Sequence, residues 1–194
     1  MFKVPAKRLR DYVGNPDPLA EAANTVAMVI ACNQPFYPFY LYFAVGGASW
    51  PSWLTLLSTP FFVAVPVVAR RSSLAGRTML ALLSIAATML AVKALGAASY
   101  VQLFLLPCVA LGALLFRPGE RAVMALVFLS AILAYLSLAN PFLDVGLGVG
   151  IATLSPGDEG AIAAVNAMSV VCLTAVIGIV FYPLLTKGSR QPPQ

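Results

Sequence analysis

The chain contains no histidine, and only 10% of its residues are charged. Without histidine, bis-histidine haem ligation, histidine-based zinc sites and Ser-His-Asp catalysis are all excluded. The charged fraction is far below the about 25% typical of soluble domains. In contrast, 60% of the residues are apolar and the mean hydropathy is +0.89. This composition favours an integral membrane protein with one domain.

Cysteine is also scarce. Cys32, Cys108 and Cys172 each lie inside an apolar run, far apart and in no CxxC spacing. We expect them to pack as free thiols. The sequence therefore predicts neither a metal site nor a cofactor site.

Long apolar runs dominate what is present. A spanning helix needs about 20 apolar residues, and the sequence predicts an all-α fold with six such helices. They are expected over residues 22–45, 52–69, 78–97, 98–116, 121–142 and 155–185. Asp17 and Pro18 are typical of a helix start, as are Ser155, Pro156 and Asp158. The first run is longer than a signal-peptide core, so we expect it to remain as a signal anchor.

The basic residues predict the orientation of these helices. Eleven of the twelve lie in the termini or in alternate gaps, all on one side of a six-helix arrangement. Because Lys and Arg are enriched in cytoplasmic loops, both termini are expected in the cytoplasm. The net charge of +5 is not gathered in one patch, so nucleic-acid binding is not expected.

This topology divides the chain into three regions. Residues 1–17 form a cytoplasmic segment, residues 18–185 the transmembrane domain, and residues 186–194 a short cytoplasmic tail expected to be disordered. Residues 143–154 are expected to form a flexible outer loop over the bundle. No soluble catalytic domain is expected.

Polar and aromatic side chains gather toward the outer ends of the predicted helices. We take the following as candidate ligand-binding residues: Asn33, Gln34, Tyr37, Tyr40, Lys93, Gln102, Asn140 and Asn166. Asn33 and Gln34 lie near the middle of their helix, so they should face the bundle interior or a wet cavity. Two readings stay open for them: interhelical hydrogen bonds, or contact with a ligand.

Prolines mark expected helix kinks, because proline removes a backbone donor. The kinks are predicted at Pro35, Pro38, Pro60, Pro66 and Pro107. Lys93 is the one basic residue that departs from the charge pattern. It is expected either to snorkel to the outer headgroups or to pair with Asp144, Glu159 or an anionic ligand.

Two stretches resemble a known family. The run from Cys32 to Gly46, CNQPFYPFYLYFAVG, is similar to the first helix of the six-helix membrane anchors of bacterial class III adenylate cyclases and quorum-sensing histidine kinases. FLLPCVALGALLF from Phe104 to Phe116, followed by RPGER, resembles their fourth helix and basic loop. The resemblance implies sensing of a lipophilic ligand, a signal passed through the sixth helix, and a bacterial inner membrane. The sequence departs from the family's pattern after that helix, where only residues 186–194 follow, so an output domain is not expected.

Three functions remain open. The first is a sensor-like or ligand-binding module for a small lipophilic or anionic ligand, which works through a protein partner or a second copy. The second is a small transporter or its substrate-binding subunit. The third is an accessory subunit of a membrane complex. An enzyme is not expected, because the sequence offers no nucleophile with an adjacent base and no intramembrane carboxylate pair.

Overall fold

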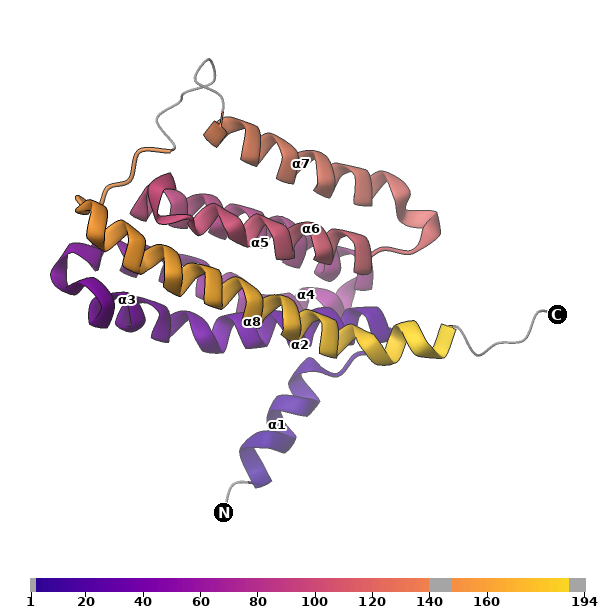
Figure 1. The fold of residues 1–194 in the computed structure, drawn as a ribbon. Helices are drawn as coiled ribbons and strands as arrows, with labels where there is room; N and C mark the ends of the chain where they lie inside the picture. Colours follow the sequence, from indigo (N-terminus) through magenta and orange to yellow (C-terminus); the bar gives the residue numbers. More distant parts are fainter. Residues whose placement is uncertain (1–2, 140–147, 189–194) are drawn as a thin grey trace.

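The computed structural model describes residues 3–139 and 148–188, and within these ranges every regular element is helical (Figure 1). The elements are α1 (Lys3–Val13), α2 (Pro18–Asn33), η1 (Gln34–Phe36), α3 (Tyr37–Val45), η2 (Gly46–Ser58), α4 (Thr59–Arg71), α5 (Ser73–Leu95), η3 (Ala97–Ser99), η4 (Val101–Phe104), α6 (Leu105–Leu114), η5 (Pro118–Glu120), α7 (Arg121–Ala139) and α8 (Pro156–Gly188). The α elements are α-helices and the η elements are 3-10 helices.

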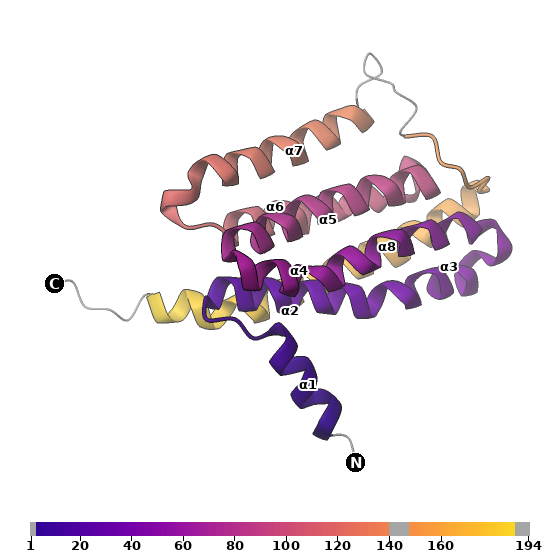
Figure 2. The same cartoon turned by 180° about the vertical axis from the view of Figure 1, so that it is seen from behind.

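Within the described residues these elements form six apolar helical segments packed side by side, which we number as passes along the chain. Four stretches are long and apolar enough to cross a membrane: Pro18–Arg71, Ser73–Leu95, Pro118–Leu138 and Pro156–Thr186. The first of them folds back on itself, since α2 packs against α4 and α3 against η2 (Figure 2). The stretch Val101–Leu114 is apolar but shorter. The all-helical fold and the count of six helical segments therefore agree with the prediction from the sequence for the part of the chain that the structure describes.

The first pass changes its helix type where the prolines lie. The α-helix ends at Asn33, continues as the 3-10 segment η1 around Pro35, and resumes as α3, whose second residue is Pro38. Proline lacks the amide that an α-helix would use at these places. The turn to the second pass is made by Gly46, whose φ of 68° favours glycine. Of the other prolines, Pro60 is the second residue of α4, Pro66 lies within α4, and Pro107 is the third residue of α6.

Several helix boundaries differ from the predicted ones. α1 was not predicted; it leaves the bundle near the start of α2 (Figure 1). α5 begins at Ser73, ahead of the predicted residue 78, because the Ser72 hydroxyl accepts a hydrogen bond from the Ala75 amide at 3.3 Å. The predicted helix 52–69 starts inside a 3-10 segment. The tail beyond Gly188 lies outside the described residues.

The two helix starts proposed from the sequence are confirmed. The Asp17 carboxylate accepts a hydrogen bond from the Leu19 amide at 3.0 Å, and Pro18 opens α2. At α8 the Ser155 hydroxyl accepts from the Asp158 amide, and the Asp158 carboxylate accepts from the Ser155 amide, both at 3.2 Å. This reciprocal pair is a capping box with aspartate in place of glutamate.

An ion pair between a buried arginine and a partly exposed glutamate joins α5 to the segment between α6 and α7. The Arg77 side chain is only 1% exposed, and its guanidinium donates to both carboxylate oxygens of Glu120, at 2.7 and 2.8 Å. Its Nε donates to the Ser73 hydroxyl at 3.2 Å. The sequence pattern treated Arg77 as a topology signal, but its charge is paired inside the protein.

Asp17 extends this pair into an ionic cluster with Ser73, Arg77, Arg117 and Glu120. Its carboxylate lies 2.9 Å from the Arg117 guanidinium and 3.8 Å from that of Arg77, and it accepts from the Ser73 hydroxyl. Burial alone would raise the pKa of Asp17, but the hydrogen bonds and the two arginines outweigh it and hold that pKa below its ordinary value. Asp17 is therefore charged at neutral pH.

Residues 148–152 pack on the end of α5. The Ile151 and Ala152 amides donate to the Lys93 and Ala94 carbonyls, both at 3.0 Å. These bonds satisfy carbonyls that a helix end leaves without partners. Part of the expected outer loop is thus bonded to α5, while residues 140–147, which include Asn140 and Asp144, lie outside the described residues.

Gly150 makes this contact possible, and we expect Gly150→Ala to weaken it. A Cβ at position 150 would lie 2.4 Å from the Gly96 nitrogen and 2.6 Å from the Leu95 carbonyl carbon. The loop can shift to relieve the clash, so the expected loss is about 1 kcal/mol, measured by thermal unfolding in detergent. Gly47→Ala is the control, because a Cβ there meets nothing within 4 Å. Equal stability of the two variants would contradict the contact.

Candidate ligand-binding site

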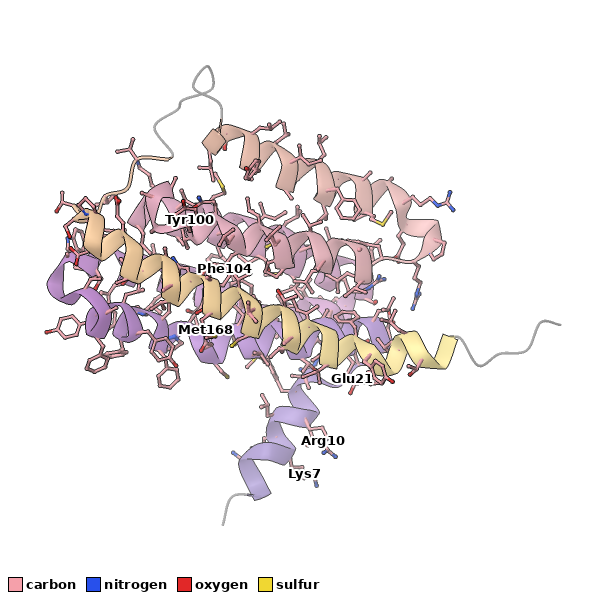
Figure 3. The ribbon with its side chains drawn as sticks, in the orientation of Figure 1. Lys7, Arg10, Glu21, Tyr100, Phe104 and Met168 are labelled. Atoms are coloured by element: carbon pink, nitrogen blue, oxygen red, sulfur yellow. The ribbon has the colours of Figure 1, made fainter. Side chains whose placement is uncertain are left out.

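A cavity of about 440 Å³ lies inside the bundle. Its wall is built by the first hairpin, which is the folded-back stretch Pro18–Arg71, and by α5, η4, α6 and α8. The lining residues are Val29, Ile30, Asn33, Gln34, Tyr37, Tyr40, Thr55, Phe62, Ser84, Ala87, Thr88, Ala91, Val101, Phe104, Pro107, Cys108, Leu111, Met168, Ser169, Cys172, Leu173 and Val176. Phe104 and Met168 are labelled in Figure 3, in the half of the bundle that holds α3. The volume falls within the range of about 300–1,000 Å³ usual for small-molecule sites.

The cavity opens on the side of the bundle. The exposed members of its wall come from two places. Val29, Asn33 and Tyr40 belong to the first pass, and Met168 and Cys172 belong to α8. The opening therefore lies between the first pass and α8, along the length of the helices rather than at their ends. In a bilayer, such an opening faces lipid.

Gln34 is the polar residue of this wall whose geometry is best defined. Its Nε2 donates to the Ser58 hydroxyl at 2.6 Å, across the first hairpin. The Ser58 hydroxyl donates in turn to the Thr55 carbonyl at 2.8 Å, so its oxygen must accept from Gln34. This chain fixes which way the amide faces. Gln34 Oε1 is buried and has no hydrogen-bond partner among the described residues.

Tyr37 lines the cavity with its ring, while its hydroxyl belongs to a structural bridge. That hydroxyl donates to Asn166 Oδ1 at 2.7 Å, and Asn166 Nδ2 donates to the Ser99 carbonyl at 2.9 Å. Asn166 is fully buried and is not part of the cavity wall. The bridge connects α3, α8 and η3, so it sets how α8 closes over the cavity.

Two other candidate residues lie away from the wall. Gln102 donates to the Ala97 carbonyl at 3.0 Å, and Lys93 donates to the Val149 carbonyl at 3.1 Å. Both bonds stabilise turns at the end of α5. Asn33, Gln34, Tyr37 and Tyr40 are thus brought together at one cavity, and Lys93, Gln102 and Asn166 support the structure around it. Asn140 is not described.

Four hydroxyls of the wall were not predicted from the sequence; we call them the wall hydroxyls. They are Thr55, Ser84, Thr88 and Ser169. Each donates its proton to a carbonyl three or four residues earlier, at 2.7, 2.8, 2.9 and 2.8 Å respectively. Ser84 and Thr88 are one turn apart, a spacing that could have identified them as one helix face.

Charge is absent from the described wall, which includes no Lys, Arg, Asp or Glu. Within residues 3–139 and 148–188, no group of three or more His, Cys, Asp or Glu side chains could hold a metal ion. The cavity as described is a neutral, mostly apolar site with a few polar atoms.

Comparisons with protein-family models, with curated proteins and with solved structures found no match to this chain.

Proposed function

We propose that this protein is a six-pass membrane module that binds a small lipophilic ligand in the cavity beside Gln34 and transmits the bound state to a protein partner. The observation that carries the proposal is the side opening of a cavity whose wall is uncharged. A ligand dissolved in the bilayer could enter there without crossing a polar surface.

The exposed surfaces of α7 and α8 support a membrane setting. Large apolar side chains point outward along both helices, including Leu129, Ile132 and Leu133 of α7 and Val171 and Ile179 of α8, each more than half exposed. Soluble monomers rarely expose apolar patches of this kind. Lipid would cover them.

The charge pattern supports an orientation with both termini in the cytoplasm, and the proposed location is a bacterial inner membrane. Arg70 and Arg71 end α4, and Arg117 and Arg121 flank η5, so the exposed arginines gather at one end of the bundle. The positive-inside rule assigns that end to the cytoplasm. α1 adds Lys7 and Arg10, which project from the same side of that helix (Figure 3).

The sensor role within this proposal draws on the resemblance to cyclase and kinase membrane anchors. The segment that carries this resemblance, residues 32–46, contributes Asn33, Gln34, Tyr37 and Tyr40 to the cavity wall. α8 forms one wall and leads toward the C-terminus, so a ligand that changes the packing of α8 would change what a partner contacts.

A cavity-filling variant tests ligand binding. Ala87→Phe places a ring in the cavity wall, whereas Ala86→Phe places the same ring on the exposed face of α5. Native mass spectrometry of protein extracted with its own lipids should detect a bound small molecule in the wild type and in Ala86→Phe. The occupancy in Ala87→Phe should fall at least about tenfold, since overpacking excludes the ligand.

The same spectra would show partner chains. Absence of any bound small molecule from the wild type, or equal occupancy in both variants, would contradict the proposal. Solute uptake by vesicles that contain only this chain would instead support a transporter.

A further inference from the structure

The polar atoms inside the cavity are mainly hydrogen-bond acceptors. The wall hydroxyls have donated their protons to backbone carbonyls, so only their oxygen lone pairs remain for a ligand. The thiol of Cys108 likewise lies 3.1 Å from the Phe104 carbonyl. A ligand in the interior therefore meets oxygens that can accept but not donate.

Gln34 supplies the strongest of these acceptors. Its amide nitrogen donates to the Ser58 hydroxyl at 2.6 Å and to the Thr55 carbonyl at 3.5 Å, so both amide protons have acceptors. The carbonyl oxygen of this cavity-lining residue is buried and has no hydrogen-bond partner among residues 3–139 and 148–188. A buried amide oxygen that lacks a donor is costly, so a ligand that offers a donor gains more than an ordinary hydrogen bond.

The remaining donors of the wall lie at its opening. Asn33 and Tyr40 are exposed, and Tyr40 is 46% exposed. Their donor groups can therefore contact a ligand at the opening, while the polar atoms of the interior are mainly acceptors. Among residues 3–139 and 148–188 the wall includes no carboxylate, so a full positive charge on the ligand would be uncompensated there.

We propose that the cavity selects a neutral, mostly apolar molecule with one hydrogen-bond donor, a hydroxyl or an amide N–H, that binds Gln34 Oε1. This inference rests on the proposed ligand-binding function and narrows it to one ligand class. It excludes an anionic ligand from this cavity, because an anion would face only acceptors inside.

The test compares an alcohol with its own methyl ether. The probes are a twelve-carbon alcohol with a photoreactive diazirine in its chain and the methyl ether of that molecule. Each is irradiated with the full-length protein in lipid nanodiscs, and labelled wall peptides are quantified by mass spectrometry. We expect the alcohol to label the wall of the wild type about tenfold more than the ether, because the ether leaves Oε1 unpaired.

The Gln34→Met variant should reduce the alcohol-to-ether ratio to about one, since methionine keeps the length but offers no amide oxygen. Gln102→Met is the matched control: Gln102 also carries a buried unpartnered Oε1, but it does not line the cavity. Its ratio should stay near that of the wild type.

The outcomes separate the two proposals. Saturable labelling of the wall by both probes, with a wild-type ratio near one, would overturn the donor requirement and leave ligand binding intact. Absence of saturable labelling by either probe would overturn both. The alcohol-to-ether labelling ratio of the wild type tests the donor requirement even if Gln34→Met does not fold.

Discussion

Replacing Glu120 with alanine is expected to destabilise the fold by about 3 kcal/mol, the lower end of the usual cost of breaking a buried ion pair, because Asp17 still lies 3.8 Å from the Arg77 guanidinium. The charge at risk is that of Arg77, which is 1% exposed and donates to both carboxylate oxygens of Glu120. Arg77 also donates to the Leu115 carbonyl, so it cannot swing out to solvent without losing a second bond. For a chain of this size, we expect the midpoint of thermal unfolding in detergent to fall by about 10 °C.

Glu21→Ala is the matched control. Glu21 is an exposed carboxylate in the first turn of α2, and the Arg77 contacts among the described residues are to Ser73, Leu115, Glu120 and Asp17. The loss of Glu21 should cost less than about 1 kcal/mol, the size of a helix-dipole effect.

A double variant separates the buried charge from general damage to the loop. Arg77→Met combined with Glu120→Ala should be no less stable than Glu120→Ala alone, because it also removes the buried charge that has lost its main partner. If the double variant lost as much stability as Arg77→Met and Glu120→Ala together, the two side chains would act independently. That result would contradict the ion pair seen in the structure.

The sequence was sufficient for architecture, because architecture follows from local patterns. Apolar run length predicted the passes, and the residues around Asp17 and Ser155 predicted two helix starts that the structure confirms. Apolar length could not predict helix type. The predicted helix 52–69 begins within the 3-10 helix Gly46–Ser58 and becomes an α-helix only at Thr59.

The chemistry of the site required contacts that the sequence does not display. Gln34 could be identified as an unusual residue for mid-membrane depth, but its orientation depends on Ser58 across a hairpin. Asn166 was a candidate for ligand contact, and the structure instead bonds it to Tyr37 and Ser99. A polar residue within an apolar helix faces something polar, and only the packing shows whether that is another helix or a cavity.

The ionic cluster illustrates the same limit for charges. Arg77 and Arg117 lie where the positive-inside rule expects them, so the pattern is explained without any pairing. Their partners are distant in the sequence: Glu120 pairs with Arg77, and Asp17 pairs with Arg117. Sequence spacing alone could not bring them together.

Gly76→Ala is expected to destabilise the bundle by about 2–3 kcal/mol, because α4 and α5 cross at this glycine with no room for a side chain. A Cβ at position 76 would lie 2.5 Å from the Ala69 Cβ, 2.7 Å from its Cα and 2.9 Å from its nitrogen. Two packed helices cannot shift as a loop can, so the overlap must separate them along their contact. The loss should appear in thermal or denaturant unfolding of the full chain.

Gly160→Ala gives the opposite expectation and serves as the control. Gly160 lies in α8, and a Cβ there meets nothing within 4 Å. Replacing an unhindered helical glycine should be neutral or stabilise by about 0.5–1 kcal/mol. The two variants make the same chemical change within helices, so their difference isolates the crossing.

A second change shows whether the backbone itself is in the way. Ala69→Gly removes the nearest atom but leaves the Ala69 Cα and nitrogen under 3.0 Å from the new Cβ. The variant Gly76→Ala with Ala69→Gly should therefore remain less stable than the wild type. Full rescue would mean that side-chain overlap alone limits the approach of α4 to α5, and a neutral Gly76→Ala would mean that the helices lie further apart than the structure places them.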